Sequence, residues 1–243
     1  LSGVALTGTE FFYPNPLESD GKTKFNQGSN TRSAWFNCSC CPVNVVRFIP
    51  NIANYIYATH GESLYVNLFI GGEAKAILGG KVVKVRQETK YPWEGKVRII
   101  VEPDKPGEFT VRVRIPGWSL GRPVPGDLYR YANASAGLPK LQVNGRTTAF
   151  EMEKGFAVLH RGWKKGDTIE LDLPMTVRRV LAHEAVKDDA GRAAIERGPV
   201  VFCAEAVDNH GHALKIVLPD AAKLKEQFRS KLLGGVMMLR GKG

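Results

Sequence analysis

The sequence predicts a mainly β protein, in which an N-terminal region with one helix is followed by β-sandwich structure. Up to about residue 62 the clearest apolar spacing is that of a helix face, whereas from Ser63 onward apolar and polar residues alternate with a period of two. Gly, Pro, Asn and Asp recur between the alternating segments. Short alternating segments with turn residues between them are typical of an antiparallel β-sandwich.

The N-terminal region is predicted to contain an extended segment, a loop and a helix. Ala5–Tyr13 is apolar and is expected to form a strand or a buried extended segment, and residues 14–32 have the composition of a loop. From Pro42 to about Ala58 apolar residues recur at spacings of four, three and four, which predicts a helix with a kink or restart at Pro50. Its apolar face consists of Val45, Ile49, Ile52 and Ile56.

Eight segments after residue 62 have the alternating pattern of strands. They are Leu64–Phe69, Val82–Thr89, Lys96–Val101, Phe109–Ile115, Leu141–Val143, Phe156–His160, Thr168–Leu173 and Val177–Ala182. Residues 117–139 are rich in Gly and Pro and are expected to form a loop excursion. Further β structure is expected at Ala193–Ala204 and Leu214–Leu218, and a short helix or charged loop at Ala221–Leu233.

Bulk composition excludes several classes of protein. The 243 residues are 43% hydrophobic, which is enough for a substantial core. No apolar run is long enough to cross a bilayer and no signal segment opens the chain, so no membrane partner is expected. The formal net charge is +10, but basic residues are scattered and many alternate with apolar ones, so nucleic acid is not expected as a partner either. Because the chain starts without Met and within an apparent strand, we expect a fragment of a longer protein.

The most informative local feature is a group of cysteines. Three of the four cysteines fall in the tetrapeptide Cys38-Ser39-Cys40-Cys41, directly before Pro42. A disulfide between adjacent cysteines would be strained, whereas converging thiolates suit a soft metal ion. Proline is favoured at the first position of a helix, and the positive end of a helix stabilises a thiolate. The alternative is that these are buried structural thiols, which is also our expectation for Cys38, while Cys203 lies in an apolar run and is expected in the core.

The cysteine pattern also bears on the compartment. Crowded cysteines are not the evenly spread framework of a secreted disulfide-rich module. A reducing compartment or a metal site therefore fits better, and we expect the cytoplasm of a bacterium, with the periplasm as the alternative.

Several motifs resemble the C-terminal half of glycoside hydrolase family 127, the β-L-arabinofuranosidases. The most specific are the Cys-Cys-Pro element with its flanks and the Ile-Pro-Gly-Trp element at Ile115–Trp118. The segments that carry the resemblance are residues 15–21, 35–44, 54–59, 87–93, 114–118, 196–201 and 232–236. It thus extends over nearly the whole chain.

The resemblance implies an architecture and a chemistry. Members of the family have an (α/α)6-barrel catalytic domain followed by β-sandwich domains. Residues 1–62 would then be the end of the barrel, 63–178 a β-sandwich and 179–243 a second, incomplete β-rich segment. By position Cys40 would be the nucleophile and a zinc ligand, and Cys41 a second ligand of Zn2+.

The same resemblance limits what this chain can do alone. The family's acid/base glutamate and its remaining zinc ligands lie upstream of Leu1, so the isolated chain is expected to be inactive. Tyr13 is a candidate hydrogen-bond donor to the sugar, with a buried structural tyrosine as the alternative. The implied partner is an arabinose-containing oligosaccharide or glycoside, and a homodimer is compatible with exposed sheet edges.

A second hypothesis is a non-catalytic β-sandwich that binds carbohydrate or supports a neighbouring domain. Such a module has no need of Cys40 and Cys41. A structural zinc module is disfavoured because no Cys or His pair accompanies these cysteines at suitable spacing. Trp93, Trp118 and Trp163 could stack on sugar, but we expect them to fill cores or edges.

Overall fold

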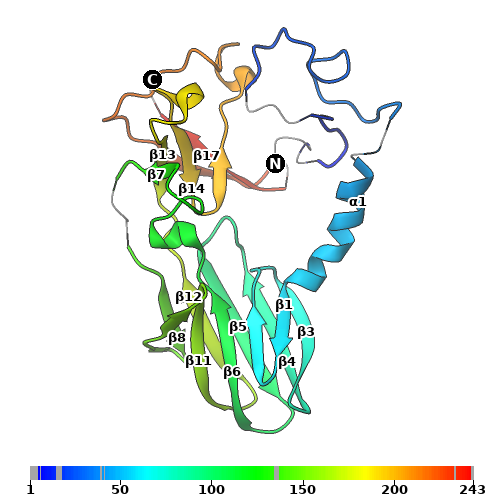
Figure 1. The fold of residues 1–243 in the computed structure, drawn as a ribbon, viewed down its shortest axis with the longest axis vertical. Helices are drawn as coiled ribbons and strands as arrows, with labels where there is room; N and C mark the ends of the chain where they lie inside the picture. Colours follow the sequence, from blue (N-terminus) through cyan, green and yellow to red (C-terminus); the bar gives the residue numbers. More distant parts are fainter. Residues whose placement is uncertain are drawn as a thin grey trace. The chain divides into compact units, whose positions relative to one another are not determined.

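The computed structural model describes residues 5, 7–14, 18–38, 40, 42–133, 137–232 and 234–241. The chain divides into two compact units, of which one comprises Leu1–Ile52 with Ala204–Gly243 and the other Ala53–Cys203. The prediction of a mainly β protein is confirmed (Figure 1). No helix in the described part of the chain is long and apolar enough to span a bilayer.

The second unit contains two sheets that pack face to face (Figure 1). The first has the order β1 (Tyr57–His60), β2 (Ser63–Val66), β6 (Gly107–Arg114), β11 (Phe156–Trp163) and β10 (Glu151–Glu153). The second has the order β3 (Gly72–Leu78), β4 (Lys81–Thr89), β5 (Lys96–Pro103), β12 (Asp167–Asp172), β8 (Lys140–Val143) and β9 (Arg146–Thr147).

The core of this sandwich comes from the inward side chains of both sheets. On β4 the residues Val83 and Val85 are fully buried while the residues between and beside them are not, as a period of two requires. They join one hydrophobic cluster with Val111 of β6 and Ile169 of β12. Each such side chain contributes about 1.5–3 kcal/mol when it is removed from water. The strands of the sandwich pair in the predicted antiparallel way, except that β2 and β6 are parallel. The hairpin of β1 and β2 forms one edge of the first sheet.

A third sheet brings together segments far apart in the sequence. It has the order β15 (Val200–Phe202), β14 (Ala194–Arg197), β13 (Val177–Ala182) and β7 (Tyr129–Tyr131). Strand β7 lies within residues 117–139, where only a loop was predicted, because three residues are too few to show alternation. The 3-10 helix η2 (Gly117–Leu120) also lies in this segment.

Buried polar groups hold this third sheet together. The Tyr131 hydroxyl donates to Glu196 at 2.8 Å, and the guanidinium carbon of Arg178 lies 3.6 Å from the centre of the Tyr131 ring. Arg178 Nη2 donates to the carbonyl of Trp118 at 2.7 Å, which ties β13 to η2. Burial, together with the Glu196 carboxylate, raises the pKa of Tyr131 above its usual range, so the phenol stays a neutral donor.

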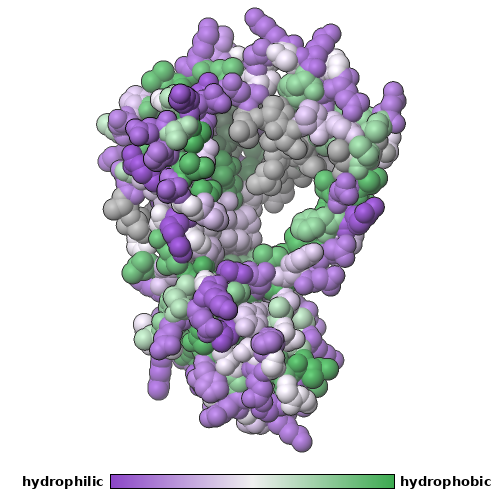
Figure 2. All heavy atoms as spheres, viewed as in Figure 1, coloured by the Kyte–Doolittle hydropathy of each residue, from purple (hydrophilic) through white to green (hydrophobic). Residues whose placement is uncertain are grey.

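The first unit contains less regular structure. It contains helix α1 (Pro42–Asn51) and, near the other end of the chain, the 3-10 helix η4 (Ala206–Asp208). The 3-10 helix η1 (Ile52–Tyr55) follows α1 and has all but its first residue in the second unit, to which η3 (Lys187–Asp189) also belongs. The predicted helix ends earlier than Ala58, because Pro50 lacks the N–H of a helical hydrogen bond and Tyr57 enters β1. Apolar side chains lie exposed along α1 (Figure 2).

Three further expectations for the ends of the chain were wrong. Ala5–Tyr13 forms no strand among its described residues, and only Phe11 makes a bridge, to Ser33. Leu214–Leu218 forms no strand, since no described segment pairs with it although its apolar and polar residues alternate. The segment predicted as a helix or charged loop contains β16 (Lys225–Arg229), which pairs with β17 (Val236–Arg240).

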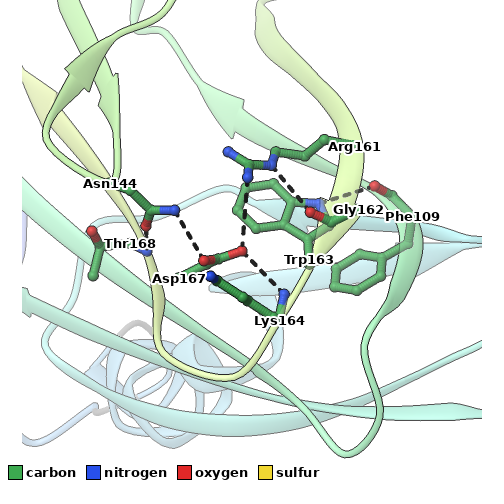
Figure 3. Close-up of polar contacts among 8 residues, drawn as sticks. All are labelled: Phe109, Asn144, Arg161, Gly162, Trp163, Lys164, Asp167 and Thr168. Atoms are coloured by element: carbon green, nitrogen blue, oxygen red, sulfur yellow. Dashed lines mark hydrogen bonds and ion pairs between the residues drawn. The ribbon is translucent and has the colours of Figure 1, made fainter.

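A polar network locks two turns of the sandwich (Figure 3). The Asp167 side chain, which is only 2% exposed, accepts hydrogen bonds from Asn144 Nδ2 at 2.9 Å and from the Lys164 backbone N–H at 3.0 Å. Asn144 Oδ1 in turn accepts from the Thr168 N–H at 2.8 Å. Asn144 and Gly145 both have positive φ, as a type I′ turn between β8 and β9 requires. The carboxylate thus joins the β8–β9 turn to the β11–β12 turn.

Replacement of this carboxylate should destabilise the sandwich. Asp167→Ala removes a buried carboxylate and leaves the Asn144 amide and the Lys164 N–H without their acceptor, so we expect the free energy of unfolding to fall by about 2–4 kcal/mol. Urea denaturation of the purified protein measures the change. Asp127→Ala, at an exposed site, is the control and should change it by less than about 0.5 kcal/mol. Equal effects of the two substitutions would show that the network does not stabilise the fold.

Candidate active site

The described cysteines of the N-terminal cluster lie together directly before α1. Cys38 and Cys40 are both exposed, so the expectation of a buried structural thiol at Cys38 was wrong. Their Sγ atoms are 3.8 Å apart. Helix α1 begins at Pro42, as predicted for a proline at the first helical position. The Asn44 side chain donates to the Cys40 carbonyl at 3.1 Å and so holds the segment before the helix. Cys41 lies outside the described residues.

Tyr13 is the nearest polar neighbour of Cys40 among the described contacts. Its hydroxyl lies 2.6 Å from Cys40 Sγ, and it also donates to Cys38 Sγ at 3.8 Å. A phenol that donates to sulfur stabilises the thiolate form, because a hydrogen bond to an ionised group is stronger than one to a neutral group. The tyrosine therefore contacts the thiol itself, which is closer to the chemistry than the expected contact with the sugar.

Two residues that the sequence did not single out hold Tyr13 in place. Asn26, which is 1% exposed, accepts a hydrogen bond from the Tyr13 N–H at 2.7 Å and donates to the Thr31 carbonyl at 2.7 Å. The buried Phe36 ring packs edge-on against Tyr13, with ring centres 5.5 Å apart. The turn at Gln27 was visible in the composition, but the side-chain bond of Asn26 spans 13 residues and left no local signal.

The other predicted residues are dispersed. Trp118 and Trp163 are buried, which confirms their core role, and Trp163 Nε1 donates to the Phe109 carbonyl at 3.0 Å. The expectation that Cys203 lies in the core was wrong. It is exposed because it directly follows the last residue of β15, where strand pairing has ended.

The donor set can be compared with what a soft metal ion requires. Zinc–thiolate bonds of about 2.3 Å in a tetrahedron place sulfur atoms about 3.8 Å apart, and the Cys38–Cys40 separation has this value. Among the described residues no group of three or more Cys, His, Asp or Glu side chains converges on one point. The described residues therefore fit part of a thiolate site, and its other ligands would have to come from Cys41 or from outside this chain.

Comparison with known proteins places the chain in one family. Three family models match it: the β-L-arabinofuranosidase GH127 catalytic domain at residues 1–54, the GH127 middle domain at 63–175 and the family 127 C-terminal domain at 177–233. The chain belongs to glycoside hydrolase family 127. The predicted resemblance is thereby confirmed.

Relatives of this family 127 chain include both sequences and solved structures. A non-reducing end β-L-arabinofuranosidase of Bifidobacterium longum is 35% identical over 97% of this chain and 35% of its own length. The structure of the GH127 β-arabinofuranosidase BT3674 matches with a TM-score of 0.90 and 40% identity over 99% of this chain and 37% of that one. Ara127N-Se of Geobacillus stearothermophilus T6, a GH127 β-L-arabinofuranosidase, has a TM-score of 0.85 and 38% identity, over 99% and 36%. The chain thus spans about a third of the length of these relatives.

The contact between Tyr13 and Cys40 should be visible in thiol reactivity. Tyr13→Phe removes the hydroxyl that lies 2.6 Å from Cys40 Sγ, and we expect alkylation of Cys40 by iodoacetamide at neutral pH to slow about tenfold because the attacking sulfur loses this hydrogen-bond partner. Peptide mass spectrometry of chelator-treated protein measures the rate at Cys40 separately from the other cysteines. Tyr65→Phe, in the sandwich, is the matched control, and an unchanged rate in Tyr13→Phe would show that the hydroxyl does not act on the thiol.

Proposed function

We propose that this chain is the C-terminal part of a retaining glycoside hydrolase that releases β-L-arabinofuranose, with Cys40 as the nucleophile. The observation that carries the proposal is the exposed Cys40 thiol, held 2.6 Å from the Tyr13 hydroxyl directly before a helix. The Bifidobacterium longum relative, a non-reducing end β-L-arabinofuranosidase, suggests the sugar.

The reaction would proceed in two displacements at the anomeric carbon. In the first, Cys40 sulfur forms a bond to this carbon while the glycosidic C–O bond breaks, and the leaving oxygen takes a proton from an acid. In the second, water displaces the sulfur, and inversion at each step gives net retention. Tyr13 would hold the thiolate in position before attack and again when it departs. The proton donor would come from a part of the protein beyond this chain.

A zinc ion is part of the proposal. Cys40 and Cys41 would hold it, and it would supply charge that keeps the nucleophilic sulfur ionised at neutral pH. What supports a metal ion here is that the exposed Cys38 and Cys40 sulfur atoms approach each other to 3.8 Å directly before α1, whereas the assignment of Cys41 rests on the family resemblance.

We further propose that residues 1–62 complete an (α/α)6-barrel. Val45, Ile49 and Phe48 of α1 are each about half exposed or more. A helix with this much apolar surface is typical of one that packs against other helices.

Covalent trapping of the full-length gene product tests the nucleophile. A covalent inhibitor of β-L-arabinofuranose configuration is expected to label Cys40, as located by peptide mass spectrometry, and the label should disappear in Cys40→Ser and after zinc removal. Cys203→Ser should be labelled like the unmodified protein, because Cys203 lies in the other unit. Label on Cys38 would assign the nucleophile to the neighbouring thiol, and label on a carboxylate would overturn the cysteine mechanism.

Metal analysis of the same protein tests the zinc site. We expect about one zinc per chain, and most of it should be lost in Cys41→Ser because a thiolate ligand is removed. Cys203→Ser should retain the metal. Full zinc content in Cys41→Ser would remove this residue from the ligand set, whatever the activity of the variant.

A further inference from the structure

The hairpin formed by β16 and β17 carries an unusual arrangement of positive charge. Lys225 and Arg240 lie directly opposite each other across the two strands, and the period of two places Arg229 on the same face. Like charges directly opposite in an antiparallel pair are destabilising. No described carboxylate lies within ion-pair distance of these three side chains. The arrangement therefore costs stability unless an anion shares the face.

A groove of about 550 Å3 lies along this hairpin. Its cations are Arg229, Lys231 and Arg240, and Asp208 of η4 is its one carboxylate among the described residues, so that positive charge prevails. Its remaining lining is polar or apolar: Gln227, Phe228, Ser230, Leu232 and Met238. All of these residues lie in the 204–243 segment of the first unit.

The groove thus combines two kinds of contact. Arg guanidinium groups bind carboxylates in a bidentate manner and are more weakly hydrated than Lys ammonium groups. Leu232 is 44% exposed and lines the groove beside these cations, whereas the period of two turns the Phe228 side chain to the opposite face of the hairpin. Apolar surface of this kind can contact the C–H faces of a sugar ring, while the cations contact its substituents.

We propose that this groove binds a carboxylated polysaccharide, with uronate groups on Arg229 and Arg240 and a sugar ring against the exposed Leu232 side chain. The inference rests on the proposed function, because a glycoside hydrolase meets its substrate as a glycan. It extends that function by naming the substrate class: terminal arabinofuranose carried on an acidic polymer rather than on a neutral one. The groove binds the acidic polymer that carries the arabinofuranose (the carrier) and takes no part in bond cleavage.

Binding of the full-length gene product to polygalacturonate tests the proposal by isothermal titration calorimetry. The control ligand is the same polymer after reduction of its carboxyl groups. We expect Arg229→Gln/Arg240→Gln to raise the Kd for polygalacturonate about tenfold or more, since two charge-assisted contacts are lost. Lys105→Gln/Lys140→Gln removes the same charge from exposed sites of the other unit and should leave the Kd within about twofold.

Three outcomes would contradict the proposal that the groove binds a carboxylated polysaccharide. They are equal losses in both double variants, equal binding of the reduced polymer, and displacement of polygalacturonate by double-stranded DNA at similar concentration. Hydrolysis of a small aryl β-L-arabinofuranoside separates this proposal from the proposed function, because the groove variant should cleave it at the unmodified rate. Binding that depends on Arg229 and Arg240 in a protein that is not labelled at Cys40 would support the groove and contradict the nucleophile.

Discussion

The burial of alternating apolar side chains between two sheets is the constraint on which the described fold depends. Leu64 of β2 and Val111 of β6 face Val85 of β4 and Ile169 of β12 within one continuous core, and all four are fully buried. A shift of one residue in any strand would turn its apolar set outward, so the core also sets the register of both sheets. The turns are then reinforced by polar contacts such as those of Asp167, whose burial is possible only because both of its oxygens accept hydrogen bonds.

The N-terminal cysteine segment has a different physical basis. Its order comes from a few local contacts, namely the bonds of Asn26, the edge-on packing of Phe36 and the start of α1. These contacts bring the Tyr13 hydroxyl to Cys40 although the two residues are 27 positions apart. An exposed thiol with a phenol against it is arranged for reaction rather than for packing, which is why this segment carries the proposed chemistry.

The two proposals concern different tasks of one protein. Attack at an anomeric carbon needs a thiolate in a defined position, and Tyr13 and the segment before α1 provide that position. Recognition of an acidic carrier needs positive charge over a longer distance, and the β16–β17 hairpin provides cations that no carboxylate among the described residues pairs with, at the cost of a like-charge pair. Part of the net charge of +10 thus belongs to the proposed binding site on the β16–β17 hairpin, and the rest is spread over solvated strand faces.

The sequence by itself determined the fold class, the family and the cysteine cluster. A period of two is a local property of consecutive residues, so the strands of the sandwich could be predicted, and the Asn144-Gly145 turn likewise. The Cys-Cys-Pro element carried the family resemblance because it is short and specific. Only the tertiary structure placed β7 beside β13, made β2 and β6 parallel and revealed β16 as a strand, since each pairing depends on a distant partner. The same holds for Asn26, whose importance lies in a side-chain bond to Tyr13 that no neighbouring residue signals.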